Sequence, residues 1–181
     1  MKKIKNNKSI ILKGNKIYLR PFELSDITKT YQKNLNNLSE SGIKTYFPRT
    51  NYELKKYYRD HKINKNSIFF TVCDLKNNQE VGTTSVSQIS WVNRNATYGR
   101  LIFEEFQGLG YGTETLKLIK KYSFNFLNLR SLWTMVYAEN FGSIKSNIKN
   151  GGKIIGSLKK HVYKNKKYQD SVIIQHLKYK N

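Results

Sequence analysis

A glycine-rich segment in the second half of this 181-residue chain most constrains what the chain can fold into. The segment reads Gln107-Gly108-Leu109-Gly110-Tyr111-Gly112-Thr113 and lies between an alternating stretch that predicts a strand and an apolar stripe that predicts a helix. Amides at a helix start lack helical partners and lie at the positive end of the helix dipole. Glycine lets such a backbone turn sharply and approach a ligand. The spacing therefore favours a loop whose amides from Leu109 to Thr113 hold a diphosphate.

The same glycines have other interpretations, which are a plain turn and two known nucleotide-binding motifs. A dinucleotide-binding loop forms the first strand–helix turn of its domain, with an acidic residue about 20 positions later. Here the loop lies past the middle of the chain, and Asn125–Arg130 contains no acidic residue. A Walker loop needs a Gly-Lys-Ser/Thr sequence that is missing here. On spacing alone, a turn without a ligand stays open.

The chain as a whole reads as a single α+β domain, residues 1–181. The expected strands cover Lys16–Phe22, Ser67–Leu75, Val81–Trp91, Thr97–Phe103, Leu132–Ala138, Lys153–Tyr163 and Tyr168–Leu177, the last two as a hairpin. The expected helices follow a cap at Ser25-Asp26, cover Tyr52–Lys62, run from the glycine loop to about Leu127, and cover Ser143–Asn150. We expect a mixed, mostly antiparallel central sheet with helices on both faces, and a loose basic tail over residues 1–13.

Composition narrows the kinds of partner and site. The chain has 33 Lys and Arg against 12 Asp and Glu, a formal charge of +21 that attracts phosphates, nucleic acids and anionic membranes. Much of this charge is Lys that accompanies abundant Asn and Ile, as AT-rich coding produces, so we do not expect a nucleic-acid partner. Cys73 is the sole cysteine, which excludes an internal disulfide, and His61, His161 and His176 lack metal-ligand spacing. We expect no metal, no membrane helix, no secretory signal and a cytoplasmic protein.

With its flanks, the glycine loop resembles the coenzyme A loop of the GNAT acetyltransferase superfamily. That loop reads Gln/Arg-x-x-Gly-x-Gly/Ala at a strand-to-helix junction, and the resemblance runs from about Lys16 to Leu177. It is carried by Tyr18-Leu19-Arg20-Pro21 with Ser25-Asp26, Gly112-Thr113-Glu114, Tyr122-Ser123-Phe124, Leu127-Asn128-Leu129, Asn140, Ser143, Lys149, Gly151 and Tyr168-Gln169-Asp170. These stretches are similar to the Rim-type branch. The chain departs from the family at Gly152, where an aromatic is usual, and at Lys33 or Asn34, where related enzymes often carry Trp.

The resemblance implies an acetyltransferase that takes acetyl-coenzyme A in a V-shaped split between two parallel strands, here Thr97–Phe103 and Leu132–Ala138. It implies cofactor contacts along the open strand edge and the loop, at Leu101, Ile102, Phe103, Gln107, Gly108, Leu109, Gly110, Tyr111, Gly112 and Thr113. Asn140 and Ser143 would meet the cofactor arm, and Lys149 a phosphate. A strand amide near Leu101 or Ile102 would stabilise the oxyanion, a contribution of roughly 2.7–4 kcal/mol in other enzymes. The amine would attack directly, without a covalent enzyme intermediate.

The groups that move protons are left as alternatives. Ser143 resembles a residue sometimes assigned as the general acid. Many members use a Tyr that would fall at about Asn147 here, so Tyr137 and water are further candidates. His161 is the first candidate for the base, because a base must change protonation near working pH. The alternative bases are Glu104, Glu105 and Glu139, and a purely structural role for His161 is an equal interpretation.

The acceptor amine is expected over the sheet, between the first two helices and the last hairpin. Its expected wall residues are Tyr46, Arg49, Trp91, Asn93, Arg94, Tyr98 and His161. Ile89–Arg94 and Asn140–Lys145 resemble acetyltransferases of nucleotide-linked amino sugars, so a small-molecule amine of the nucleotide-sugar type is the first hypothesis. The alternatives are a protein N-terminus, as in ribosomal-protein acetyltransferases, and a non-enzymatic RNA- or membrane-associated module. A homodimer is a candidate assembly.

Overall fold

The computed structural model describes residues 10–36, 49–63, 65–164 and 166–178. Its elements are β1 (Leu12–Lys13), β2 (Ile17–Pro21), α1 (Leu24–Asn36), α2 (Asn51–Ile63), β3 (Ile68–Asp74), β4 (Glu80–Ser90), β5 (Asn95–Ile102), η1 (Glu104–Phe106), α3 (Tyr111–Lys121), η2 (Tyr122–Phe126), β6 (Ser131–Tyr137), α4 (Phe141–Lys149), β7 (Lys153–Lys164) and β8 (Lys167–Leu177). η1 is a 3₁₀ turn, and η2 is a π-helical turn that prolongs α3.

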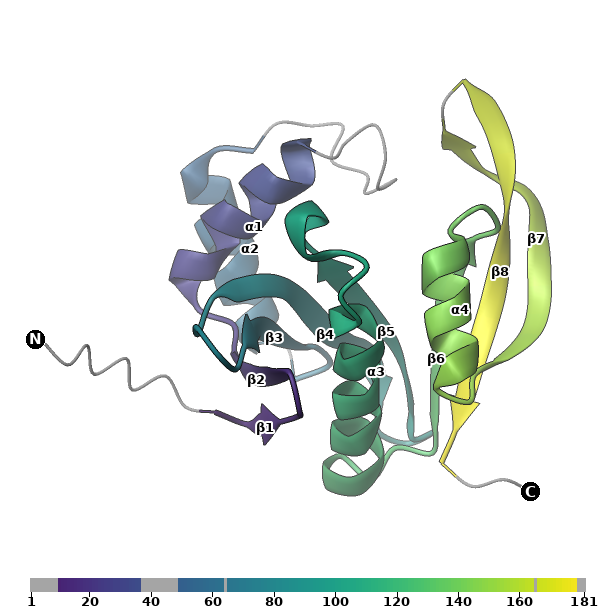
Figure 1. The fold of residues 1–181 in the computed structure, drawn as a ribbon, viewed down its shortest axis with the longest axis horizontal. Helices are drawn as coiled ribbons and strands as arrows, with labels where there is room; N and C mark the ends of the chain where they lie inside the picture. Colours follow the sequence, from purple (N-terminus) through teal and green to yellow (C-terminus); the bar gives the residue numbers. More distant parts are fainter. Residues whose placement is uncertain (1–9, 37–48, 64, 165, 179–181) are drawn as a thin grey trace, which may run out of the picture.

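The strands form one sheet in the order β1-β2-β3-β4-β5-β6-β8-β7, in which only the β5–β6 pair is parallel within the described residues. Figure 1 shows α3 and α4 in front of this sheet, while α1 and α2 pack together on the other side. Alternation along β2 links the two layers. Leu19 enters the core with Leu116 of α3, whereas its neighbour Arg20 bonds to Asp26 of α1. The expected mixed, mostly antiparallel sheet with helices on both faces is confirmed.

The parallel strands β5 and β6 stay paired over a short stretch only. Asn95–Thr97 is in register with Ser131–Trp133, and no ladder pair joins the two strands beyond it in the part of the chain described. β5 continues against β4 as far as Ile102, and β6 continues against β8 as far as Tyr137. The strands therefore part with their inner edges open, as the resemblance predicts for this pair.

Three expectations about element ends need correction. The loose tail expected over residues 1–13 is wrong at its end, because Leu12–Lys13 pairs with β2 and Leu12 is buried in the core, while residues 1–9 lie outside the described part of the chain. Asp26 does not cap α1 from outside. It lies within the first turn, where its carboxylate accepts a bond from the Glu23 amide. The helix expected to continue to about Leu127 ends as an α-helix at Lys121, because the next turn widens into η2.

A buried ion pair fixes α1 to the sheet. Arg20 is 1% exposed and donates to both carboxylate oxygens of Asp26, at 2.6 and 2.7 Å. It also donates to Glu80 at 2.6 Å, and the Thr71 hydroxyl donates to Asp26 at 2.8 Å. Burial by itself would raise the pKa of the Asp26 carboxyl. The bonds from Arg20, the Glu23 amide and Thr71 outweigh burial and hold that pKa below its ordinary value.

We predict that Asp26→Asn lowers the free energy of unfolding by about 3–5 kcal/mol at neutral pH, because it leaves the Arg20 guanidinium buried beside a neutral group. The folded pKa of Asp26 is lowered, so its stabilisation is present above the unfolded value of about 3.9 and is lost as the pH falls through the folded pKa. Urea unfolding at a series of pH values should show the variant and wild type converging in acid. Asp60→Asn, at an exposed site on α2, is the control. Equal stability of variant and wild type at neutral pH would contradict the assignment.

Candidate active site

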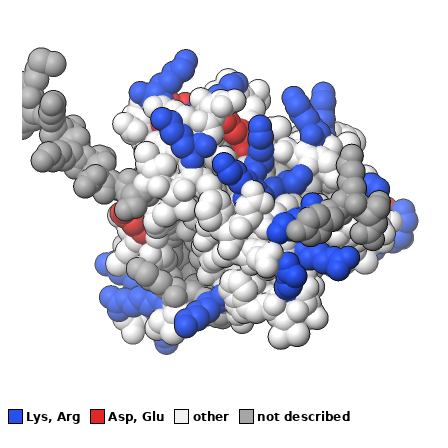
Figure 2. Space-filling model, turned by 90° about the horizontal axis from the view of Figure 1, so that it is seen from below, with Lys and Arg blue, Asp and Glu red and all other residues white. Residues whose placement is uncertain are grey.

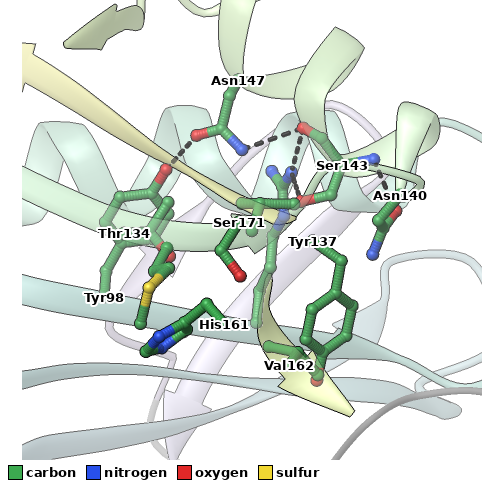
Figure 3. Close-up of a pocket in the computed structure, with 13 residues that line it drawn as sticks. Tyr98, Thr134, Tyr137, Asn140, Ser143, Asn147, His161, Val162 and Ser171 are labelled. Atoms are coloured by element: carbon green, nitrogen blue, oxygen red, sulfur yellow. Dashed lines mark hydrogen bonds between the residues drawn. The ribbon is translucent and has the colours of Figure 1, made fainter. Parts of the chain in front are cut away.

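A cavity of about 320 Å³ lies where β5 and β6 part. β5 lines it with Tyr98–Arg100 and β6 with Thr134–Tyr137. Ser143 near the start of α4 and His161 from β7 add two polar side chains to its wall (Figure 3). The cavity therefore joins two open strand edges to hydroxyl, imidazole and guanidinium groups, an arrangement suited to an extended ligand arm that pairs with backbone.

The glycine loop turns from β5 into α3 through two left-handed residues. Gly108 and Gly110 have φ values of 78° and 85°, which residues with a Cβ rarely adopt. A Cβ at Gly108 would meet nothing within 4 Å, and a Cβ at Gly110 would lie 3.7 Å from the Lys16 ammonium. The first amide of α3 that bonds back into the loop is that of Glu114, to Gly110. The preceding amides thus lack helical partners, and this backbone cradle beside a cation fits a diphosphate.

Lys16 contacts the glycine loop from just before the start of β2, a contact that we did not predict from the sequence. Its ammonium donates to the Leu109 carbonyl at 3.0 Å. Its amide and that of Asn15 bond to the Glu114 carboxylate in the first turn of α3. These contacts join the start of β2 to a loop more than 90 positions later, so no local pattern signals them. Lys16 therefore adds a cation to a backbone cradle that fits a phosphate.

The residues expected along the open strand edge lie at the end of β5 and just after it. Leu101 and Ile102 end β5, next to the loop, and Gln107 donates through its side-chain amide to the Ile102 carbonyl at 3.2 Å. Gln107 therefore braces the loop against the strand. The Phe103 side chain is buried and its amide bonds to Val81 of β4, so that amide is not offered to a ligand, and none of Leu101, Ile102 and Phe103 lines the cavity.

The residues expected at α4 lie at its two ends. Asn140 caps the helix, because its side-chain oxygen accepts from the Ser143 amide at 3.0 Å. Asn140 and Ser143 both line the cavity (Figure 3). Lys149 is the last residue of α4 and lies about 9 Å further along the helix axis than Ser143. The structure therefore brings Asn140 and Ser143 together with the cavity and leaves Lys149 at the opposite end of the helix.

Beside the cavity, Tyr98, Asn147 and His176 form a buried hydrogen-bonded group. The Tyr98 hydroxyl donates to Asn147 Oδ1 and lies 3.2 Å from His176 Nε2, which lies 3.1 Å from Asn147 Oδ1. Figure 3 shows Asn147 joining Tyr98 to the Ser143 carbonyl. Burial raises the pKa of the Tyr98 phenol. Burial, together with two nearby cations, lowers the pKa of His176 to about 4, so this imidazole is neutral at pH 7.

The same group explains the departure at Gly152. A Cβ there would lie 2.7 Å from Cε1 and 2.8 Å from Nε2 of His176, and 2.9 Å from Cγ2 of Ile174. The His176 ring thus fills the space that a larger side chain at position 152 would need. Because interiors are close-packed, glycine at this position is required by the histidine on β8.

His161 reaches the cavity through a bulge in β7. The register between β7 and β8 shifts between Leu158 and Val162, and Lys160 has a left-handed φ of 48°. Asp170 holds this bulge, because it accepts from the Lys160 amide at 2.9 Å and pairs with Lys159. Bulges re-aim side chains near functional sites. Here the bulge precedes the last part of β7, toward the hairpin end, and His161 lies in the cavity wall (Figure 3).

The alternative bases lie elsewhere. Glu104 begins η1, just before the glycine loop, and does not line the cavity. Glu105 pairs with Lys33, and Glu139 pairs with Lys167 at 3.0 Å. Among the expected bases, His161 is therefore the one in the cavity wall.

The expected acceptor residues are spread over separate places. Tyr98 and His161 line the cavity. Trp91, Asn93 and Arg94 follow β4 in its turn to β5, at the closed end of the strand pair, where Arg94 bonds to Asn128. Arg49, just before α2, lies over the ring of Tyr57 on that helix. Tyr46 falls outside the described residues.

Arg100 is the cavity residue that sequence reasoning passed over. It is the charged residue in an otherwise neutral strand, β5, two positions after Tyr98 and so on the same face. Its guanidinium donates to the Gly112 carbonyl at 2.7 Å and to the Ser143 carbonyl at 3.3 Å. A cation in the middle of a half-buried strand was the available signal.

Charge on the surface is overwhelmingly positive. Figure 2 shows Lys and Arg side chains projecting from all parts of one face, with few acidic residues among them. In the described part of the chain, five acidic side chains form ion pairs with Lys or Arg: Asp26 and Glu80 with Arg20, Glu105 with Lys33, Glu139 with Lys167, and Asp170 with Lys159. The described residues contain no group of three His, Cys, Asp or Glu that could hold a metal, and none of their helices is long and apolar enough to cross a membrane.

We predict that Gly110→Ala raises the Kd for coenzyme A about tenfold. A side chain at this positive φ costs about 1–3 kcal/mol of strain and turns the loop amides from their present directions. Isothermal calorimetry would measure the Kd. Gly156→Ala on β7 is the control, because its nearest neighbour to a Cβ is 4.0 Å away. An unchanged Kd in Gly110→Ala would exclude the loop as the diphosphate site.

Comparison with known proteins identifies the family. The model of the acetyltransferase (GNAT) domain matches residues 16–153. Spermidine N(1)-acetyltransferase of Escherichia coli K12 is 30% identical over 171 residues, which cover 90% of this chain and 88% of that protein. The corresponding Vibrio cholerae protein is 28% identical over 161 residues, or 87% and 90% of the two chains.

Solved structures agree. The crystal structure of spermidine N-acetyltransferase from Vibrio cholerae in complex with CoA and spermine superposes with a TM-score of 0.80 at 26% identity, over 91% of this chain and 96% of that one. The family resemblance is thereby confirmed at the level of the superfamily, while these relatives are named for spermidine and not for amino sugars. The chain belongs to the GNAT acetyltransferases and is an acyl-CoA N-acetyltransferase that uses acetyl-CoA.

Proposed function

We propose that this enzyme acetylates a primary amine of a polyamine such as spermidine. The observation that carries the proposal is the similarity to spermidine N(1)-acetyltransferase over 90% of this chain and 88% of that protein. The structure supports it with a cavity that opens between parted strands and carries a candidate base, His161. A polyamine needs little more than an open approach and a group that takes its proton.

Each part of the site has a task in this reaction. Acetyl-coenzyme A supplies an activated acetyl group when bound. The amides before Glu114 and the Lys16 ammonium hold its diphosphate, and the open edge of β5 aligns its arm. Asn140 fixes the start of α4, and His161 accepts the proton that the attacking ammonium must lose. No residue forms a covalent bond with the acetyl group, and the buried Cys73 thiol, whose pKa burial raises, is unsuited to that role.

A nucleotide-linked amino sugar is the second candidate, and the charge of the chain favours it. A formal charge of +21 repels a polyamine and attracts a diphosphate. Within the described residues, Asp60 and Glu104 are the carboxylates without an intramolecular partner, so few are free to bind an ammonium. The two candidates therefore differ in the sign of the field that an approaching acceptor meets.

We predict that spermidine and spermine release thiol from acetyl-CoA with kcat/KM at least about tenfold above nucleotide-4-amino-sugars, N-terminal peptides and aminoglycosides. Because like charges repel, kcat/KM for the polyamines should rise with added salt, whereas an anionic acceptor should lose kcat/KM under the same change. A thiol-release assay at low and high salt measures both. Preference for the nucleotide-sugar, with kcat/KM falling in salt, would reject the polyamine and select the second candidate.

We predict that His161→Ala lowers kcat about 100-fold and removes the ascending limb of the kcat/KM profile against pH, because the ammonium then loses its proton to solvent. His161→Gln keeps a hydrogen-bonding side chain of similar size but cannot act as a base, so it should behave like the alanine variant. Calorimetry with coenzyme A should show unchanged binding in both. A profile that keeps its limb in both variants would exclude His161 as the base.

A further inference from the structure

Arg100 carries a positive charge into the parted strands without a carboxylate to balance it. Its guanidinium spans the first turns of two helices, donating to the Gly112 carbonyl of α3 and to the Ser143 carbonyl of α4. Ser143 Oγ lies 3.5 Å from Arg100 Nη2, the nitrogen that donates to the Ser143 carbonyl. Within the described residues no Asp or Glu pairs with it, although it is half-buried and lines the cavity.

Holding a cation at the position of Arg100 costs solvation free energy. A buried charge without a counter-ion loses solvation that only an anion or several strong hydrogen bonds can replace. Both carbonyl partners are at helix starts, where the helix dipoles add further positive potential. The positive potential extends to His176, whose pKa is lowered by burial and by the charges of Lys120 and Arg100. The cavity is therefore a positive region that lacks an anion.

Acetyl transfer creates an anion in such a region. A bond forms between the amine nitrogen and the acetyl carbon, and the carbon–sulfur bond of the thioester breaks. The electron pair leaves with sulfur. The ammonium gives up one proton to a base before it attacks, and the nitrogen gives up a second proton, to solvent or to the departing sulfur, as the amide forms. The Tyr98 phenol is not free to protonate the sulfur, because its hydrogen is already donated to Asn147 and burial raises its pKa. Ser143, Tyr137 and solvent remain as proton donors, and whichever of them acts, negative charge develops on the sulfur as the carbon–sulfur bond breaks.

We propose that Arg100 is the cation that stabilises the coenzyme A thiolate as it leaves. The proposal rests on acetyl transfer from acetyl-CoA, whichever amine is the acceptor. The diphosphate has its own donors at the mouth of the site, in the loop amides and Lys16, whereas the Arg100 guanidinium lies inward beside Ser143. Arginine suits the task, because it keeps its proton throughout the working pH range and has five donors, of which the two carbonyls use two.

The test is the acidity of bound coenzyme A. The ultraviolet absorbance of the thiolate is followed against pH with coenzyme A saturated by wild type, Arg100→Met, Arg100→Lys or Arg130→Met. Arg130 is exposed and outside the cavity, so its variant matches the change in charge. Cys73, the sole cysteine, is subtracted with the protein alone. Wild type and Arg130→Met should lower the thiol pKa by about one unit relative to free coenzyme A, a tenfold gain in thiolate. Arg100→Met should abolish this shift, and Arg100→Lys should keep part of it.

Several outcomes would overturn the proposal. If the thiol pKa of coenzyme A bound to wild type equals that of free coenzyme A, the proposal is wrong, and no variant is needed to show it. An unaltered shift in Arg100→Met would also overturn it, and if that variant fails to fold, an unaltered shift in the equally neutral Arg100→Gln would have the same meaning. A weaker Kd with an unaltered thiol pKa would assign Arg100 to the diphosphate instead. Failure of spermidine to react would leave this titration intact, because it needs no acceptor. Failure of wild type to bind coenzyme A in calorimetry would instead overturn the proposed function.

Discussion

The parting of β5 and β6 is the constraint on which the rest of this structure depends. A sheet normally pairs every inner edge, because unpaired buried backbone groups cost free energy. Here the pairing stops after Thr97 and Trp133, yet each strand stays fixed by its outer neighbour, β4 or β8. The open edges form a slot whose mouth meets the glycine loop at the start of α3. A cofactor arm bound in the slot would supply the missing partners and complete the sheet.

A group of buried polar residues lies beside this slot. Tyr98, Asn147 and His176 satisfy one another beside it, and Gly152 gives the His176 ring its room. These positions must change together, because a side chain at 152 would collide with the imidazole. The residues that depart from the family pattern, Asn147 and Gly152, therefore belong to a single alternative packing arrangement. That arrangement occupies the Tyr98 phenol in a hydrogen bond and leaves Arg100 as a charged group in the cavity wall.

Local patterns predicted most of the fold, and long-range contacts account for what they missed. Alternation and helical spacing placed the strands and helices, and the glycine spacing placed the loop, because each of these is set by neighbouring residues. Lys16 and the role of Asp26 depend on contacts between segments far apart in the chain. The bulge that turns His161 depends on Asp170 across the hairpin. Arg100 could have been noticed as a charge in a neutral strand, but its two carbonyl partners come from helices that the sequence alone does not bring together.

The field inside the slot acts on both reactants. A cation beside the thioester favours the thiolate, and by the same electrostatics it disfavours an ammonium at the attacking position. An amine arriving there loses its proton more readily than in water, which assists its transfer to His161. The same field works against a polyamine at the encounter stage and in its favour at the chemical step. A chain with so large a positive charge can therefore acetylate a cation, provided that the amine sheds its proton as it enters the slot.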